Sequence, residues 1–126
     1  MFSHVTLGTN DVEKALGFYD AVLGTLGIER FHTGDWGAGY GTMQGGQTWV
    51  MNPYDGKDAR SGNGVHVAYL ASSRAAVDEF HQAALANGAT DEGAPGLRQH
   101  YHPNYYGCYV RDLDGNKLQA VCHTPE

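Results

Sequence analysis

The chain has 126 residues, a size typical of one domain, and its 8 lysines and arginines against 14 aspartates and glutamates give a net charge of −6. This acidic total excludes a broad surface for nucleic acid or anionic membranes, because such surfaces need clustered cations. No apolar run approaches the ~20 residues that span a bilayer, and the first residues lack the features of a secretory signal. We therefore expect a cytoplasmic protein.

Glycine, tyrosine and histidine are enriched in the chain. The 18 glycines predict many turns or bulged strands rather than a helical bundle. The 8 tyrosines and 7 histidines could line a cavity or an interface, or could be scattered over the surface. Cys108 and Cys122 match no zinc spacing and are too few for a disulfide framework, so we expect both to be buried as small apolar residues.

The first half of the chain predicts a strand, a helix and three further strands. Polar and apolar residues alternate over 3–9, as in a half-buried strand. A single apolar helical face follows, with Asn10 in the N-cap position and Gly27 as the C-cap. The three short strands are expected at 28–33, 36–43 and 47–52, with Gly45-Gly46 in the last turn.

The second half repeats this order after a polar, turn-rich segment. A strand is predicted at 65–70, and a helix capped by Ser72 or Ser73 runs to Asn87. A loop is expected at Ala94-Pro95-Gly96. Strands at 105–111 and 117–123 flank the turn at 112–116, which is a strong hairpin pattern.

An internal duplication explains this repetition. With an offset of 62 residues, His4 falls on His66 and Phe18 falls on Phe80. The fold class is therefore predicted to be α+β, built from two βαβββ modules. Module 1 covers about 1–53, a linker covers about 54–62, and module 2 covers about 63–126.

The two matched histidines begin the first strand of each module. Because side chains alternate along a strand, His4 and His66 point away from the apolar faces that would pack on the helices. Two imidazoles that converge on one cavity near a pseudo-two-fold axis suit a metal ion. The alternative is that each is an isolated, hydrogen-bonded histidine.

The hairpin at 109–119, with its Asp-x-Asp-Gly-Asn turn, and the tract at 95–106 are the most specific motifs. Together with the paired modules and their histidines, they resemble the vicinal oxygen chelate superfamily, and the tract is similar to its glyoxalase-like subgroup. This superfamily includes glyoxalase I, extradiol dioxygenases, fosfomycin-resistance enzymes and bleomycin-resistance proteins. The resemblance covers essentially the whole chain and implies a cupped, partly open mixed β-barrel with a divalent metal at its centre.

The resemblance also implies a set of metal ligands from the first and last strands of the modules. The matching positions are His4, His66 and Gln119, and the ion would be Fe, Mn, Ni, Zn or Co. The family usually has glutamate in place of Gln119, and the remaining position offers only Gln47. Glutamine keeps an oxygen donor but lacks the negative charge, so we expect weaker metal binding. A glyoxalase I reaction would also lack its base.

The tract at 100–106 contains the other concentration of functional groups. It could fold over the cavity, with His102 and Tyr105 as proton-transfer groups and Tyr101 as part of the substrate site. The alternative is a surface loop whose tyrosines pack on the helices or on a partner. The remaining substrate-site candidates share one strand face: Gln47, Trp49 and Met51.

These features lead to two hypotheses about function. The first is a metal-dependent enzyme of the lyase, isomerase or dioxygenase class that acts on a small molecule with vicinal oxygens. The alternative is a metal-free protein of the bleomycin-resistance type that sequesters an aromatic or cationic antibiotic. In either case the partner is a small molecule rather than a nucleic acid or a membrane. The resemblance implies a homodimer, since some relatives complete their sites across the interface.

Overall fold

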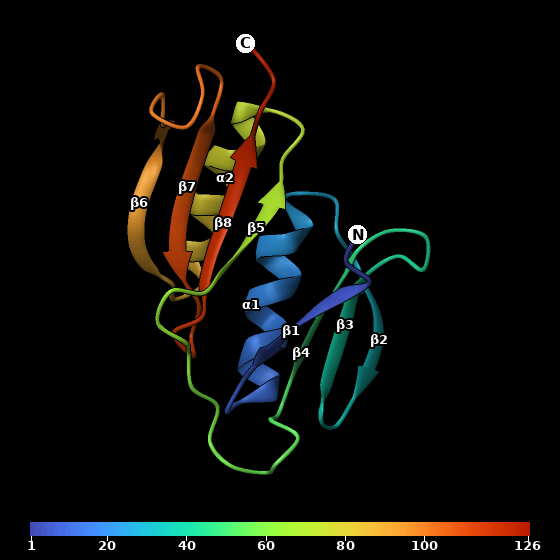
Figure 1. The fold of residues 1–126 in the computed structure, drawn as a ribbon. Helices are drawn as coiled ribbons and strands as arrows, with labels where there is room; N and C mark the ends of the chain where they lie inside the picture. The colour runs from blue at the N-terminus through green and yellow to red at the C-terminus, as the bar shows by residue number, and fades with distance from the viewer.

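The chain folds into two four-stranded sheets, with the first helix between them and the second helix packed behind the C-terminal sheet (Figure 1). A computed structural model describes all residues, 1–126. Its elements are β1 (His4–Gly8), α1 (Val12–Gly24), β2 (Arg30–Gly34), β3 (Gly37–Gly41), β4 (Gln47–Met51), β5 (His66–Leu70), α2 (Arg74–Ala86), β6 (Thr90–Leu97), β7 (Tyr106–Arg111) and β8 (Lys117–Cys122).

The two sheets have the same topology. Sheet A has the order β1-β4-β3-β2, and sheet B has the order β5-β8-β7-β6. The pairs β1–β4 and β5–β8 are parallel, and the other neighbours are antiparallel. The predicted α+β fold with two βαβββ modules is therefore confirmed. No strand of sheet A pairs with a strand of sheet B, which is consistent with a cupped, open barrel.

The ends of α1 differ from the prediction. Asp11, rather than Asn10, is the N-cap, and its side chain accepts a hydrogen bond from the backbone N–H of Lys14. Asn10 instead joins three segments: its N–H donates to Asp114, and its side chain bonds to the backbone of Ala59. The helix ends at Gly24, before the predicted Gly27 cap.

Strand β6 also differs from the prediction, because the expected loop at Ala94-Pro95-Gly96 lies inside this strand. Its pairing with β7 shifts register twice, between Asp91 and Gly93 and between Gly93 and Gly96. Strand β6 is the outer strand of sheet B, and an edge strand with bulges tolerates a proline that lacks a backbone donor.

The turn at 112–116 fastens the two modules together. The buried Asp112 accepts a hydrogen bond from the Tyr19 hydroxyl of α1 and others from the backbone N–H groups of Asp114 and Asn116. Asn116 in turn donates to the carbonyl of Gly8 at 3.0 Å. Burial, and then the Asp112 carboxylate, raise the pKa of Tyr19 well above its usual range, so this phenol stays protonated as a donor.

The remaining sequence predictions about the interior also agree with the fold. Cys108 and Cys122 are buried free thiols, and burial raises the pKa of Cys108 to about 11. The apolar faces of both helices join the two sheets in one hydrophobic core. No helix is long and apolar enough to cross a membrane.

Candidate functional site

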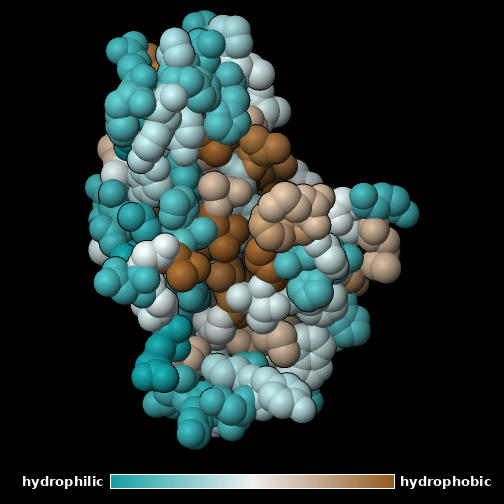
Figure 2. All heavy atoms as spheres, viewed as in Figure 1, coloured by the Kyte–Doolittle hydropathy of each residue, from teal (hydrophilic) through white to brown (hydrophobic).

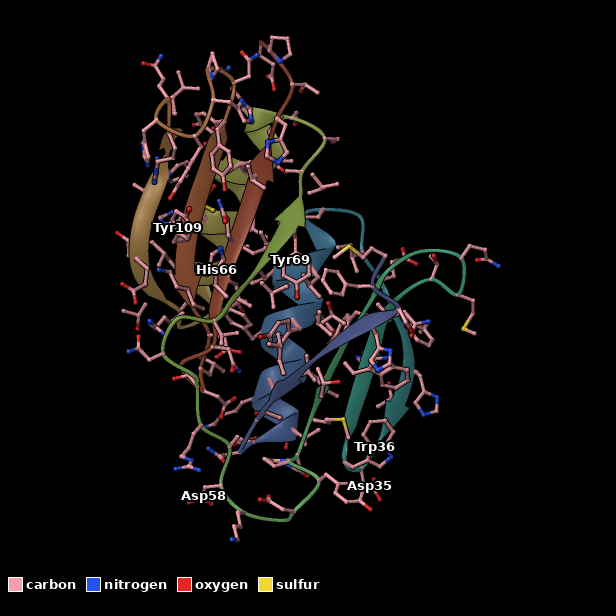
Figure 3. All side chains as sticks on the ribbon, in the orientation of Figure 1. Asp35, Trp36, Asp58, His66, Tyr69 and Tyr109 are labelled. Carbon is pink, nitrogen blue, oxygen red and sulfur yellow. The ribbon has the colours of Figure 1, made fainter.

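Each sheet has one face packed in the core and one open face. The side chains of β4 alternate between buried and partly exposed positions, and those of β5 between buried and exposed ones. As predicted, Gln47, Trp49 and Met51 share one face of sheet A, and it is the open one. The open face of sheet B carries His66, and Figure 3 shows this histidine beside Tyr109. The candidate site residues therefore lie mainly on these two open faces.

On sheet B, two of the predicted metal ligands form a hydrogen-bonded chain with a predicted catalytic residue. The Nε2 atom of His66 lies 3.2 Å from Oε1 of Gln119, and Nε2 of Gln119 donates to the Tyr105 hydroxyl at 2.6 Å. Because an amide oxygen only accepts, His66 donates from Nε2 in this bond. Gln119 is 1% exposed, and a side chain at Gly107 would lie 3.0 Å from its amide nitrogen.

The donor set of one chain does not fit a divalent metal ion. His66 would have to move its Nε2 proton to Nδ1 and give up the bond to Gln119 before Nε2 could bind an ion, and Gln119 supplies no negative charge to attract one. The third predicted ligand, His4, lies on sheet A, where its Nδ1 is 2.9 Å from the Ser3 hydroxyl. His4 and His66 line different cavities. No group of three His, Cys, Asp or Glu side chains in the chain could hold a metal ion.

Sheet A offers no further metal ligand. The β1–β4 register places Trp49 beside Thr6, just as the β5–β8 register places Gln119 beside Ala68. A tryptophan therefore occupies the position in module 1 that corresponds to Gln119. Its indole N–H donates to Oε1 of Gln47 at 3.0 Å, so the Gln47 oxygen already has a partner.

The open face of sheet A instead carries four aromatic rings in contact with one another, which we call the aromatic face: Phe31, His32, Trp36 and Trp49. The Trp36 and Trp49 rings lie 5.9 Å apart at an interplanar angle of 23°, and Phe31 meets Trp49 edge-on at 5.4 Å. Both tryptophans of the chain lie in this face. A ligand that binds here would therefore contact the chromophores directly.

Glycines of β3 make room for the aromatic face. A Cβ atom at Gly39 would lie 2.9 Å from the Trp49 ring and 3.0 Å from the Phe31 ring. The alternating glycines at 37, 39 and 41 were therefore the sequence signal for a bare strip beneath the rings. Trp36 was expected, with Trp49 and Met51, as part of an apolar pocket, whereas Phe31 and His32 of β2 were absent from the predicted site.

Tyrosines and two cations surround the His66–Gln119–Tyr105 chain on sheet B. The Tyr101 and Tyr105 rings lie 4.8 Å apart, and burial followed by the neighbouring Tyr105 and Tyr101 hydroxyls raises the pKa of Tyr109. The Arg98 guanidinium lies 5.9 Å and the Lys117 ammonium 5.1 Å from the centre of the Tyr109 ring. The sequence analysis did not place Tyr109, Arg98 or Lys117 in the site.

The predicted catalytic pair, His102 and Tyr105, also lies at this end of sheet B. His102 Nε2 is 2.8 Å from Nδ1 of His123, and the Asn104 N–H donates to His102 Nδ1 at 3.1 Å. Since His102 Nδ1 accepts, its Nε2 is the donor to His123. The Tyr105 ring contacts both imidazoles, at centroid distances of 5.4 and 5.2 Å, and Tyr101 is 58% exposed beside them.

Two cavities flank the open faces. One of about 350 Å³ lies where β4 enters the linker and is lined by Met51, Thr6 and residues 52–55 and 58–60. The other, of about 510 Å³, lies at the junction of the modules and is lined mostly by apolar side chains, together with His4 and Gln47. Figure 2 shows apolar side chains gathered in the middle of this face of the molecule.

The two duplicated βαβββ modules, each a four-stranded sheet with one open face, define the fold class of the chain. Residues 1–120 match the model of the Glyoxalase/Bleomycin resistance protein/Dioxygenase superfamily, and the chain belongs to this superfamily. A search among curated proteins found no match.

Solved structures agree with this assignment. A glyoxalase/bleomycin resistance protein from Albidiferax ferrireducens T118 is 40% identical, with a TM-score of 0.90 over 98% of this chain and 99% of that one. A family enzyme from Burkholderia phytofirmans PsJN is 20% identical (TM-score 0.76; 97% and 98% covered). The fosfomycin resistance protein FosX from Listeria monocytogenes is 21% identical (TM-score 0.68; 98% and 93% covered). The last two likenesses concern the fold alone.

Proposed function

We propose that this protein binds a small aromatic molecule without a metal ion, as a sequestering protein of the bleomycin-resistance type. The observation that carries the proposal is the hydrogen-bonded chain from His66 through Gln119 to Tyr105. In this chain of hydrogen bonds, His66 and Gln119, two of the expected metal ligands, bond to each other. A neutral imidazole and a neutral amide, without any carboxylate, are a weak donor set for a divalent ion.

The aromatic face supports an aromatic ligand. Offset stacking and edge-to-face contacts with aromatic rings add ~0.5–1.5 kcal/mol per pair beyond the burial of apolar area. Trp36 and Trp49 offer such contacts on an open surface, and Met51 beside them is an adaptable apolar contact. The name of the superfamily includes bleomycin resistance proteins, and this proposal extends that ligand-binding role to the present chain.

We also propose that two copies of the chain associate through the edges of their sheets. Strand β1 is one of the two edge strands of sheet A and β5 is one of the two of sheet B, and each exposes backbone groups without a ladder partner. Phe2, beside β1, is 73% exposed, and Leu70 of β5 is 74% exposed. Both line the apolar cavity between the modules, and a second copy would bury them.

The oligomeric state tests this association. Light scattering after size exclusion should give twice the chain mass of 13.6 kDa for the wild type. Leu70→Lys should shift the protein toward the monomer, because a buried unpaired charge is costly in an interface. Leu113→Lys, the same substitution at a leucine of the hairpin turn that is 43% exposed, should leave the dimer intact. A monomeric wild type, or the same effect in both variants, would contradict the association.

Metal titration tests the metal-free proposal. Calorimetric titration of chelator-treated protein with Fe, Mn, Ni, Zn and Co should give no binding tighter than about 10 μM, since neutral donors bind these ions weakly. In parallel, 1-naphthamide should shift the two indole N–H signals in the ¹H–¹⁵N spectrum, because both tryptophans lie in the aromatic face. Gly39→Ala should weaken this shift. Stoichiometric tight metal binding would refute the proposal.

A metal-dependent lyase, isomerase or dioxygenase is the second candidate function. One observation favours it: His66 and Gln119 lie side by side on the same open face, with N and O atoms 3.2 Å apart. In this hypothesis His4 would come from the partner of a dimer. Loss of bound metal in both His4→Ala and His66→Ala would support it, and diketones, hemithioacetals and catechols would then be the substrates to test.

A further inference from the structure

Two cations on the open face of sheet B have no carboxylate partner. The four ion pairs of the chain include neither Arg98 nor Lys117. The two acidic side chains of β6, the strand that ends just before Arg98, are already paired: Asp91 with His81 and Glu92 with Arg111.

Both cations lie next to the residues of the candidate site. Lys117 is the register partner of His66, so the two side chains project from the same face of neighbouring strands. Arg98 and Lys117 each lie within 6 Å of the Tyr109 ring centre, and the His66 ring lies 5.8 Å from it. Figure 3 shows His66 and Tyr109 close together on this face.

The side chains here offer hydrogen-bond donors that are not used within the chain. Arg98 has five N–H donors, and one of them bonds to the carbonyl of Ala94 at 2.8 Å. This bond fixes the guanidinium over β6 and leaves its other donors free.

We propose that the open face of sheet B binds an anionic oxygen group of a small molecule, a carboxylate or a phosphonate, through Arg98 and Lys117 beside His66. This inference goes beyond the proposed function, which places an aromatic ligand on the open face of sheet A. The two cations supply the charge-assisted bonds that make the recognition strong. The same positive charge weakens binding of a divalent cation to His66 and Gln119.

The first test uses simple anions. Backbone amides of β7 and β8 are followed in ¹H–¹⁵N spectra while acetate, or separately methylphosphonate, replaces chloride at constant ionic strength. We expect saturable shifts, with the tighter of the two anions identifying the group that the site recognises. Arg98→Gln and Lys117→Gln should each weaken binding about tenfold, as expected for loss of one charge-assisted contact. Lys117→Arg should restore it.

A matched control separates local binding from net charge. Lys14→Gln removes the same charge from the outer surface of α1, where the Lys14 side chain is 77% exposed, and should change anion binding less than about twofold. Shifts that do not saturate in the wild type would overturn the inference. Equal weakening in Lys14→Gln and Lys117→Gln would overturn it as well.

A second test distinguishes this inference from the proposed function. Calorimetry compares 1-naphthoate with its neutral amide, 1-naphthamide, on the wild type and on Lys117→Gln. We expect the carboxylate to show a binding event that the amide lacks, and Lys117→Gln to weaken that event about tenfold. Identical binding of the two compounds would refute the anion site while leaving aromatic binding intact. Saturable anion binding without any naphthamide binding would support the anion site and refute the aromatic ligand.

Discussion

Gln119→Glu should convert the neutral His66–Gln119 pair into a metal site. The new side chain has nearly the same shape, and its oxygen would replace one that lies 3.2 Å from His66 Nε2. The Tyr105 hydroxyl accepts a bond from Gln119 and could instead donate to a carboxylate, so this contact is reversed rather than lost. Burying the charge should lower the free energy of unfolding by about 1–2 kcal/mol.

The expected gain in metal affinity follows from the added charge. Two unit charges 4 Å apart interact by about 1 kcal/mol in water, so a carboxylate and a divalent ion gain about 2 kcal/mol. Since about 1.4 kcal/mol corresponds to a factor of ten, this is a gain of about thirty-fold. Direct coordination at shorter range would increase it, and Lys117 and Arg98 nearby would reduce it.

Calorimetric titration with Ni and Co measures this gain. The affinity should rise at least about tenfold in Gln119→Glu and should return to the wild-type level when His66→Ala is added. The double variant is the control, because it keeps the new charge and removes the imidazole beside it. Equal metal affinity in the wild type and in Gln119→Glu would refute the reasoning that the missing charge makes this a metal-free site.

Three further predictions test the fold and the aromatic face. Asp112→Asn should lower the free energy of unfolding by about 3 kcal/mol, because the Tyr19 hydroxyl and the turn lose their charged acceptor; a loss under ~1 kcal/mol in urea unfolding would contradict this. Gly39→Ala should displace the Trp49 ring, shift its indole signal and weaken naphthamide binding about fivefold. An unchanged indole signal would contradict the inference that the glycines of β3 make room for the rings. Burial raises the pKa of Tyr69 to about 12 from 10.0, so the unfolded state ionises first and Tyr69 alone should lower the free energy of unfolding by up to about 2–3 kcal/mol between pH 10 and 12. Urea unfolding at several pH values checks this, with Tyr69→Phe as the control that should lose less, and a constant value through this range would contradict it.

The periodicity of the sequence was sufficient to predict the fold class. Local patterns predicted the alternation in the strands, the two helical faces and the repeat that places His4 on His66. The structure contains all three. The element ends were harder to predict, because tertiary contacts decide them. Asn10 could cap a helix, yet its side chain bonds to Ala59 on the linker, and Asp11 takes the cap instead.

The candidate site was only partly predictable from sequence. Strand parity placed Gln47, Trp49 and Met51 on one open face, because it depends only on alternation. Lys117 and Tyr109 became part of the site only through the register between β5, β8 and β7, which no local pattern fixes. The separation of His4 and His66 on two unpaired sheets also depends on how the modules pack.

The most direct test of the central claim is naphthamide binding with and without a chelator. The two indole N–H signals are followed while 1-naphthamide is titrated, first in excess EDTA and then with stoichiometric Ni or Co. Metal-independent binding at the aromatic face predicts the same saturable shift and the same dissociation constant in both conditions. Loss of the shift in EDTA and its return with metal would contradict the claim.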